Sequence, residues 1–225
     1  AAISVRMLEE AGYRPFEPGK AYAPGDKVYW VNRKKAVIAT TFGRKPIEEG
    51  VRINGAHIDS PRLDLKPVPL YEKNDIAYFK THYYGGLRKY QWGTIPLALH
   101  GVIIREDGAE ITVSVGEEKG EPAFCVTDLL PHLSAEQNKR PLSEGIKGEE
   151  LNILIGSMPF MDDESDEKIK DAVKLQVMAL LNEKYGITEK DFIRAEIEMV
   201  PAFCARDIGF DRSLIGAYGQ DDRVC

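Results

Sequence analysis

Residues 51–61 have the sequence VRINGAHIDSP, and the architecture we predict for the chain starts from them. The β-branched and apolar residues of this run predict a strand over 51–58. Pro61 ends the strand, because proline cannot donate to a strand ladder and keeps the preceding residue out of the helical region. Ligands of open α/β sheets bind where strands end, so His57 and Asp59 are predicted to lie at the mouth of a site.

The chain before this strand has the pattern of an α/β domain. Residues 1–13 predict a short amphipathic helix. The runs 28–31 and 36–42 are rich in β-branched residues and bounded by turn residues, which predicts two more strands. The α/β pattern resumes late in the chain, so residues 1–66 and 206–225 are expected to form one domain.

The interruption, residues 67–205, is predicted to be a β-rich insert. Its expected elements are strands over 76–84, 97–105, 111–115 and 193–199, and an amphipathic helix over 164–185 that Asp162 or Ser165 can cap. A hairpin turn joins the second and third of these strands. The fold class is therefore α/β, with a mixed-sheet domain flanked by helices and interrupted by a β-rich domain.

The composition excludes two classes of partner. The 225 residues carry a net charge of −6, and an acidic surface attracts neither nucleic-acid phosphates nor anionic lipids. No apolar run approaches the ~20 residues that a membrane span requires, and the first residues lack the basic flank and apolar core of a signal peptide. Three scattered cysteines suit buried thiols in a reducing compartment. We expect a cytoplasmic protein that binds no nucleic acid and no membrane.

Both ends of the sequence have features of cut ends. The chain has no initiator Met, and its last residues, GQDDRVC, contain neither a helix stop signal nor a polar tail. We therefore expect the chain to be truncated.

The first candidate for chemistry is the pair His57 and Asp59. Residues i and i+2 of a strand project to the same side, so the two side chains are expected to be neighbours. A histidine that binds a metal through one ring nitrogen needs an acceptor at the other, and a carboxylate is a common one. An isolated H-x-D triplet is more often a core histidine beside a surface acid, so this pair alone does not identify a site.

The second candidate is Asp221, within GQDDR at residues 219–223. A carboxylate has two oxygens and can bridge two metal ions, which a single histidine nitrogen cannot do. Adjacent acids facing one pocket repel each other, so Asp222 is expected to pair elsewhere, with Arg223 close at hand. The alternative is a solvated acidic turn before a helix, where Asp is common as a cap.

Taken together, the motifs of this chain resemble those of the aspartyl aminopeptidase family. Residues 54–61 resemble its G-A-H-x-D-S-P segment, and Tyr84-Gly85-Gly86 with Trp92 resembles the Y-G-G…W stretch that opens its second domain. Two further matches are Leu130-Pro131-His132-Leu133 with the family's P-x-L segment, and residues 219–223 with its x-D-[DN] turn. Their order and separations match along nearly the whole chain, and four ordered matches are more specific than any one.

The resemblance implies a role for each matching residue. His57 would ligate one metal ion, Asp59 would be the catalytic residue that orients His57 and tunes its basicity, and Asp221 would bridge two divalent ions. The ions would be zinc, with cobalt or manganese as alternatives. A Glu-Glu pair, another Asp and a final His complete the site in this family, so activity would require residues beyond Cys225.

The chain departs from the family at position 136. Family members often have at this position a histidine that reaches the active site of a neighbouring subunit, whereas this chain has Glu136. His132 is the nearest imidazole and is a candidate for substrate binding, with a structural role as the alternative. The departure puts a preference for acidic N-terminal residues in doubt.

The function that the resemblance implies is removal of N-terminal residues from peptides by water activated between two metal ions. Residues 1–66 and 206–225 would be an incomplete metallopeptidase domain, and residues 67–205 a dimerisation and lid domain. Peptide substrates and self-association into a large homo-oligomer would follow. The alternatives are another dinuclear zinc hydrolase, such as a carboxypeptidase or deacylase, and a non-catalytic fragment that serves assembly only.

Overall fold

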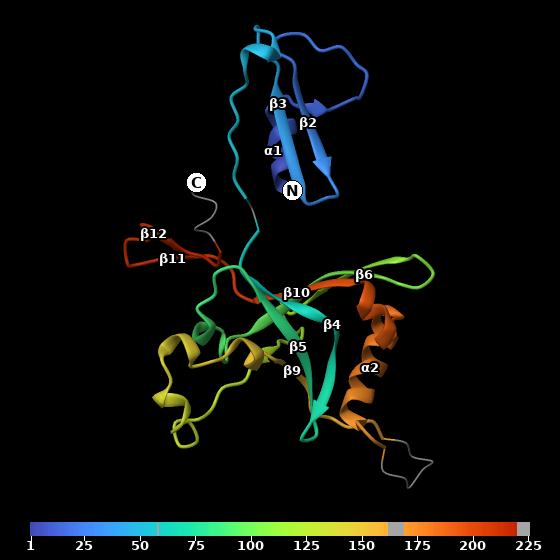
Figure 1. The fold of residues 1–225 in the computed structure, drawn as a ribbon, viewed down its shortest axis with the longest axis vertical. Helices are drawn as coiled ribbons and strands as arrows, with labels where there is room; N and C mark the ends of the chain where they lie inside the picture. The colour runs from blue at the N-terminus through green and yellow to red at the C-terminus, as the bar shows by residue number, and fades with distance from the viewer. Residues whose placement is uncertain (58, 162–168, 220–225) are drawn as a thin grey trace. The chain divides into compact units, whose positions relative to one another are not determined.

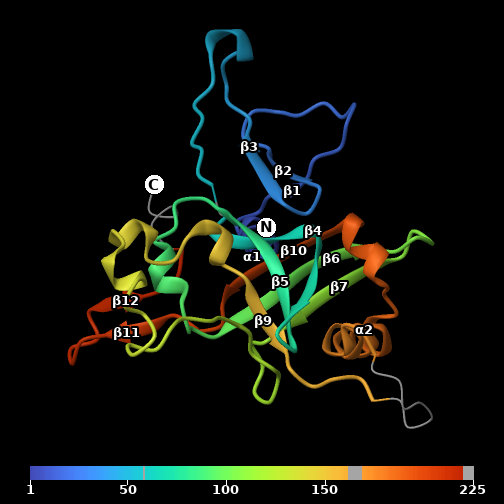
Figure 2. The ribbon, with the colours of Figure 1, turned by 60° about the horizontal axis from the view of Figure 1, so that its bottom comes forward.

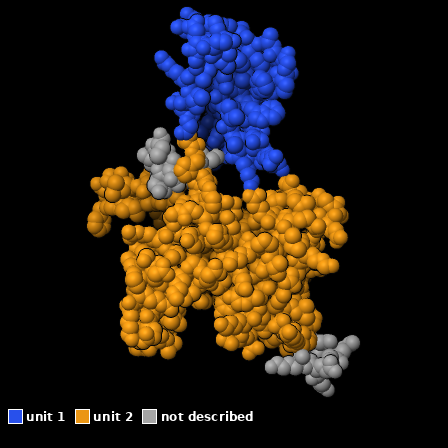
Figure 3. Space-filling model, in the orientation of Figure 1, with its two compact units in different colours: residues 1–55 blue, residues 56–225 orange. Residues whose placement is uncertain are grey.

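The computed structural model describes residues 1–57, 59–161 and 169–219, which form two compact units (Figures 1 and 3). The first unit comprises residues 1–55 and the second residues 56–225. The mixed α/β class predicted from the sequence is confirmed. The predicted border between residues 66 and 67 falls inside a strand of the second unit, and the assignment of residues 67–205 as an inserted domain stays a prediction.

The first unit is a three-stranded sheet with one helix. The helix is α1 (Ala2–Glu10), and the strands β1 (Arg14–Pro15), β2 (Lys27–Asn32) and β3 (Ala36–Thr41) follow in that order across the sheet. The predicted helix and the two predicted strands are confirmed. The Tyr29 hydroxyl donates a 2.7 Å hydrogen bond to Glu9, which ties β2 to α1.

The strand predicted over residues 51–58 is wrong for the part that the structure describes. After a short 3₁₀ turn, η1 (Ile47–Glu49), residues 50–57 belong to no helix or strand and are all exposed. Residue 58 lies outside the described ranges. β-branched residues favour an extended backbone, but a strand forms only where a neighbour takes up its hydrogen bonds, and no described strand pairs with this run.

The second unit is built on a seven-stranded sheet in the order β7-β6-β10-β4-β5-β9-β8, in which all neighbours are antiparallel. Its strands are β4 (Arg62–Lys73), β5 (Ile76–Tyr84), β6 (Leu97–Ile104), β7 (Glu110–Val115), β8 (Cys125–Val126), β9 (Ile153–Gly156) and β10 (Ala195–Pro201). The strands predicted over 76–84, 97–105 and 111–115 and the hairpin turn between the last two are confirmed. The strand predicted from residue 193 begins two residues later, because η6 (Glu189–Arg194) is a 3₁₀ helix.

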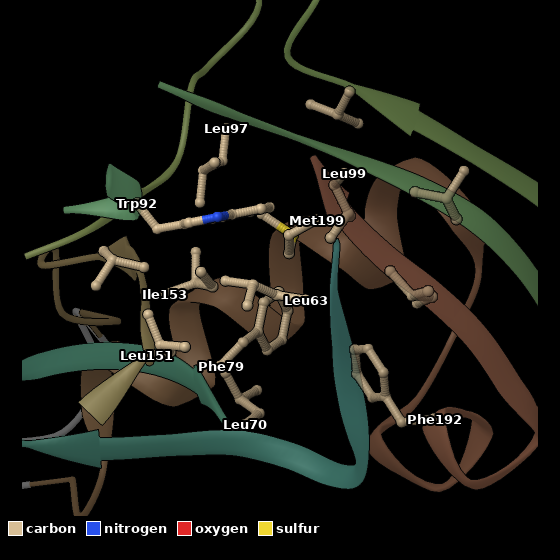
Figure 4. Packing of buried hydrophobic residues seen from close by; sticks show 14 of the residues in the cluster. Leu63, Leu70, Phe79, Trp92, Leu97, Leu99, Leu151, Ile153, Phe192 and Met199 are labelled. Atoms are coloured by element: carbon tan, nitrogen blue, oxygen red, sulfur yellow. The ribbon is translucent and has the colours of Figure 1, made fainter. Parts of the chain in front are cut away.

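The core of this unit lies where β4, β6, β9 and β10 meet. Leu63, Leu97, Ile153 and Met199 come one from each of these strands and are fully buried (Figure 4). Trp92, in the 3₁₀ helix η2 (Lys89–Trp92), packs into the same cluster. Four segments distant in the sequence therefore share one apolar interior.

The one long helix among the described residues, α2 (Ala172–Tyr185), packs on β4, β5 and β9 (Figure 2). It begins eight residues later than predicted, because residues 169–171 are not helical and Asp171 has a left-handed backbone (φ 52°). The predicted caps Asp162 and Ser165 lie outside the described ranges. Val173, Val177 and Leu181 face the core as expected, whereas Leu180 is exposed.

The remaining elements lie in two stretches for which no helix or strand was predicted. Between β8 and β9 are three 3₁₀ turns, η3 (Gln137–Lys139), η4 (Leu142–Glu144) and η5 (Gly148–Glu150), and after β10 a small hairpin joins β11 (Arg206–Ile208) to β12 (Leu214–Gly216). Of the cysteines predicted to be buried, Cys125 is half-buried, Cys204 is exposed, and Cys225 lies outside the described residues.

Gly101 allows β6 and β10 to approach closely, and we predict that Gly101→Ala destabilises the second unit. A methyl group there would overlap the carbonyl oxygen of Glu196 and lie 2.8 Å from Ile197 Cα. Because both atoms belong to a central strand, we expect a loss of about 1–3 kcal/mol in the free energy of unfolding, measured by urea denaturation.

Gly145→Ala is the matched control. Gly145 has a helical backbone (φ −54°), and the nearest atom to a methyl group there is 3.5 Å away. The control should unfold as the wild type does, and equal stability of the two variants would contradict the close approach at β6.

Candidate metal-binding site

His57 and Asp59 are in direct contact although no strand aligns them. Asp59 Oδ1 lies 2.6 Å from His57 Nδ1. The two side chains are 58% and 39% exposed, so the pair lies at the surface rather than in the core. Because Asp59 engages Nδ1, a metal ion would be bound through Nε2.

Tyr84, the last residue of β5, also affects Asp59. Tyr84, followed by His57, lowers the pKa of the Asp59 carboxyl below its ordinary value, and Asp59 in turn raises the pKa of the Tyr84 hydroxyl. Asp59 is therefore an ionised carboxylate at neutral pH.

Arg62, the first residue of β4, supports Tyr84 from the neighbouring strand. Its guanidinium lies 4.1 Å from the centre of the Tyr84 ring. Arg62 Nε is 2.8 Å from Asp64 Oδ1 and 3.2 Å from Glu198 Oε1. The arginine thus connects β4, β5 and β10 at the end of the sheet nearest the pair.

Three segments distant in the sequence meet around this pair. Gly85 (φ 78°) packs on Pro61, since a methyl group at position 85 would lie 3.4 Å from the proline Cα. Gly219 packs on Ser60, since a methyl group at position 219 would lie 2.5 Å from Ser60 Oγ. The start of β4, the end of β5 and the segment after β12 therefore converge on residues 59–61.

The Trp92 and Tyr218 side chains reinforce this convergence. Their ring centres are 5.8 Å apart with the planes at 84°, an edge-to-face arrangement. Tyr218 packs against the core cluster to which Trp92 belongs. The last described segment of the chain is thereby fixed beside the sheet, two residues before Asp221, which lies outside the described ranges.

His132 is exposed in the segment between β8 and β9. Within residues 1–57, 59–161 and 169–219 its side chain has no hydrogen bond or ion pair with His57 or Asp59. A pocket of about 400 Å³ lies nearby, lined by Pro131, Ser134, Gln137 and Arg140 among others, and His132 is not among its lining residues. Its substrate-binding role stays a prediction.

The other two histidines, His82 and His100, have contacts with neighbouring side chains. His82 stacks on Tyr83 with ring centres 5.6 Å apart. His100 Nε2 lies 3.3 Å from Glu117 Oε1, and its Nδ1 lies 3.3 Å from Ser114 Oγ. Among the contacts described for these two histidines, none is with His57 or Asp59.

The described residues do not form a whole metal site by themselves. Among them, no three His, Cys, Asp or Glu side chains lie close enough together to hold an ion. The pair His57 and Asp59 nevertheless fits a metal, because the ring nitrogen that would not bind the metal already has a carboxylate acceptor. Sequence reasoning missed Tyr84 and Arg62, for which the only signal was the Tyr-Gly-Gly motif.

The chain is similar to known proteins along its whole length. The model of the family described as aminopeptidase I zinc metalloprotease (M18) matches residues 2–225. A probable M18 family aminopeptidase 1 of Clostridium acetobutylicum is 52% identical over 98% of this chain and 48% of its own length, and one of Thermotoga maritima is 50% identical over 98% and 47%. The chain spans about half the length of these curated relatives.

Solved structures give the same result. The crystal structure of the M18 aminopeptidase from Thermotoga maritima matches with a TM-score of 0.88 at 49% identity; the match covers 98% of this chain and 47% of that chain. The crystal structure of aminopeptidase I from Borrelia burgdorferi matches with a TM-score of 0.83 at 40% identity; the match covers 100% of this chain and 50% of that chain. No helix within the described residues is long and apolar enough to cross a membrane.

The contact between Gly219 and Ser60 leads to a prediction. Gly219→Ala should lower the free energy of unfolding by about 1–3 kcal/mol, because the methyl group would overlap Ser60 and because φ at this position is +60°. Urea denaturation of the 225-residue chain measures this loss.

A second variant separates the contact from the backbone strain. Ser60→Gly removes the Oγ and Cβ that the new methyl group would meet, so the double variant should regain part of the stability lost in Gly219→Ala. If the double variant loses as much as the sum of the two single variants, the two segments are not in contact.

Proposed function

Because the chain belongs to the M18 family of zinc metalloproteases, we propose that it forms part of a metal-dependent aminopeptidase that removes N-terminal residues from peptides. The observation that carries this proposal is the contact between His57 and Asp59 inside the segment that resembles the family's metal-binding motif. Family membership favours an aminopeptidase over a carboxypeptidase or a deacylase.

Two divalent ions, both zinc, would occupy the site, with His57 as a ligand of one and Asp221 as the bridge between them. The family description supports zinc, and the number of ions is part of the proposal. Bound zinc supplies a Lewis acid for the peptide carbonyl and makes water a stronger nucleophile near neutral pH.

The residues of this chain have a positioning role in that chemistry. Asp59 accepts the Nδ1 proton of His57, which fixes the tautomer with its lone pair on Nε2 and the orientation of the ring. A general base is needed to transfer the proton to the leaving amine, and it would be supplied by residues that follow Cys225 in the full-length protein.

The rest of the polypeptide would also complete the fold around the first unit. Residues 50–57 are exposed and lie in no helix or strand, which supports a strand partner supplied by the rest of the full-length protein. An apolar pocket of about 430 Å³ opens on the sheet of the first unit and supports the same conclusion; its lining residues are Phe16, Pro18, Val28, Tyr29, Trp30, Ile38 and Thr40. In this proposal residues 1–66 and 206–225 belong to the catalytic domain, and residues 67–205 form the inserted domain.

Self-association is the second part of the proposal. Leu129, Leu130, Leu133 and Leu142 are each more than half exposed in the segment between β8 and β9. Exposed leucines gathered on one segment are typical of a surface that another protein covers. We place this interface between copies of the same protein, which would act on peptides in the cytoplasm.

His57→Ala in the full-length protein tests the metal assignment. We expect the variant to lose one metal equivalent and nearly all aminopeptidase activity, because alanine removes the ligand and leaves Asp59 without its partner. Elemental analysis of the purified protein measures the metal, and release of an N-terminal residue from a short peptide measures the activity.

His82→Ala is the matched control, because His82 stacks on Tyr83 and is assigned no ligand role. It should keep the full metal content. A metal content of the His57 variant equal to that of the control would refute the assignment, and the 225-residue chain alone is expected to be inactive.

A further inference from the structure

Asn54 and Gly55 form an Asn-Gly dipeptide three residues before His57, and no other asparagine of the chain precedes a glycine. Asparagine is a thermolabile residue, because its side-chain amide can react with the backbone nitrogen of the next residue. The reaction requires that this nitrogen reach the side-chain carbonyl carbon, Cγ. Glycine has no Cβ, so it lets the backbone fold back for this approach. The dipeptide is therefore a candidate for chemical modification.

The structure leaves both reacting groups accessible. Residues 50–57 are exposed and lie in no helix or strand, and the side chain of Ile53 is 82% exposed. Within residues 1–57, 59–161 and 169–219, neither the Asn54 side chain nor the Gly55 N–H makes a hydrogen bond. No described contact thus keeps the Gly55 nitrogen away from Asn54 Cγ.

A comparable dipeptide in the same chain, Asp107-Gly108, is held in the turn between β6 and β7. The Gly108 N–H donates a 3.0 Å hydrogen bond to the Arg105 carbonyl oxygen. The Ala109 N–H donates a 3.0 Å hydrogen bond to Asp107 Oδ1. The nitrogen and the side-chain carbonyl that would have to meet are both engaged elsewhere, so a turn of this kind protects its dipeptide.

We propose that Asn54-Gly55 is a spontaneous modification site, at which the chain deamidates and can lengthen its own backbone before His57. The Gly55 nitrogen bonds to Asn54 Cγ, and the side-chain nitrogen leaves with the glycine proton as ammonia. A cyclic imide remains, and water opens it at either carbonyl. One opening gives aspartate. The other gives isoaspartate, in which the main chain runs through Cβ and Cγ and gains a carbon.

Pairing of this segment with another strand would suppress the reaction. A strand ladder takes up N–H groups and keeps the backbone extended, which holds the Gly55 nitrogen away from Asn54 Cγ. In the proposed function residues 50–57 gain a strand partner from the rest of the full-length protein, and this part of the inference rests on that proposal. An isoaspartate formed before pairing shifts the alternation of side chains along the strand, so His57 points away from its place.

Incubation of the folded 225-residue chain in mildly alkaline buffer tests the site. Asn54 should lose its amide within a few-fold of the rate in the same chain unfolded in urea, because no contact restrains it. Peptide mapping by mass spectrometry measures the loss, and enzymatic methylation detects isoaspartate. If Asn54 keeps its amide in the folded chain and loses it in urea, the site is not reactive and the inference is overturned.

Two variants separate the chemistry from the setting. Gly55→Ala hinders the approach to Cγ and should keep the Asn54 amide several-fold longer; its methyl group meets no atom within 4 Å, so the fold should not change. Asp107→Asn creates a second Asn-Gly dipeptide inside the turn, which suits this pair. Position 107 should keep its amide while Asn54 of the same molecules loses it. Equal loss at both positions would contradict the protection that the structure assigns to the turn.

The full-length protein tests the effect of pairing. Its Asn54 should lose the amide several-fold more slowly than Asn54 of the 225-residue chain under the same conditions. Equal rates would overturn suppression by pairing. Zinc content is measured on the same samples, and its absence contradicts the proposed metal site without changing the result at Asn54.

Discussion

A strand is stable only where a neighbouring strand takes up its backbone hydrogen bonds, and this requirement organises the whole chain. Residues 62–201 contain all seven strands of the larger sheet, so this part encloses its own core. Residues 50–57 have a sequence suited to a strand but no neighbour among the described residues. The segment that carries His57 therefore gets its order from side chains at the end of the sheet.

Those side chains explain why the Tyr-Gly-Gly motif lies so far in sequence from the His-x-Asp motif. Tyr84 lies beside Arg62, three residues after Asp59, because β4 turns directly back into β5, which brings residue 84 opposite residue 62. Gly85 then leaves the strand with a positive φ and packs on Pro61. Two motifs of the chain are thus parts of one local structure.

Much of the fold could be predicted from the sequence, because side-chain periodicity reports which face of an element is buried. The hairpin of β6 and β7 was predictable from alternating residues and its turn. The start of α2 was not, since its apolar periodicity does not reveal the left-handed backbone at Asp171. In the site, His57 and Asp59 are in contact as predicted, but not through the strand on which that prediction was based. The contacts of Arg62 depend on strand register, which no local pattern encodes. The position of Asp221 stays a prediction.

The register of β4 against β5 shifts between Leu65 and Leu70, where five positions on β4 correspond to two on β5. Pro67 and Pro69 lie in this bulge, where the absence of their N–H groups costs no ladder hydrogen bonds. The bulge separates the two ends of the hairpin. Four ladder pairs lie on the turn side of the bulge and four on the side of residues 62 and 84, so each end of the hairpin is held in register by its own pairs.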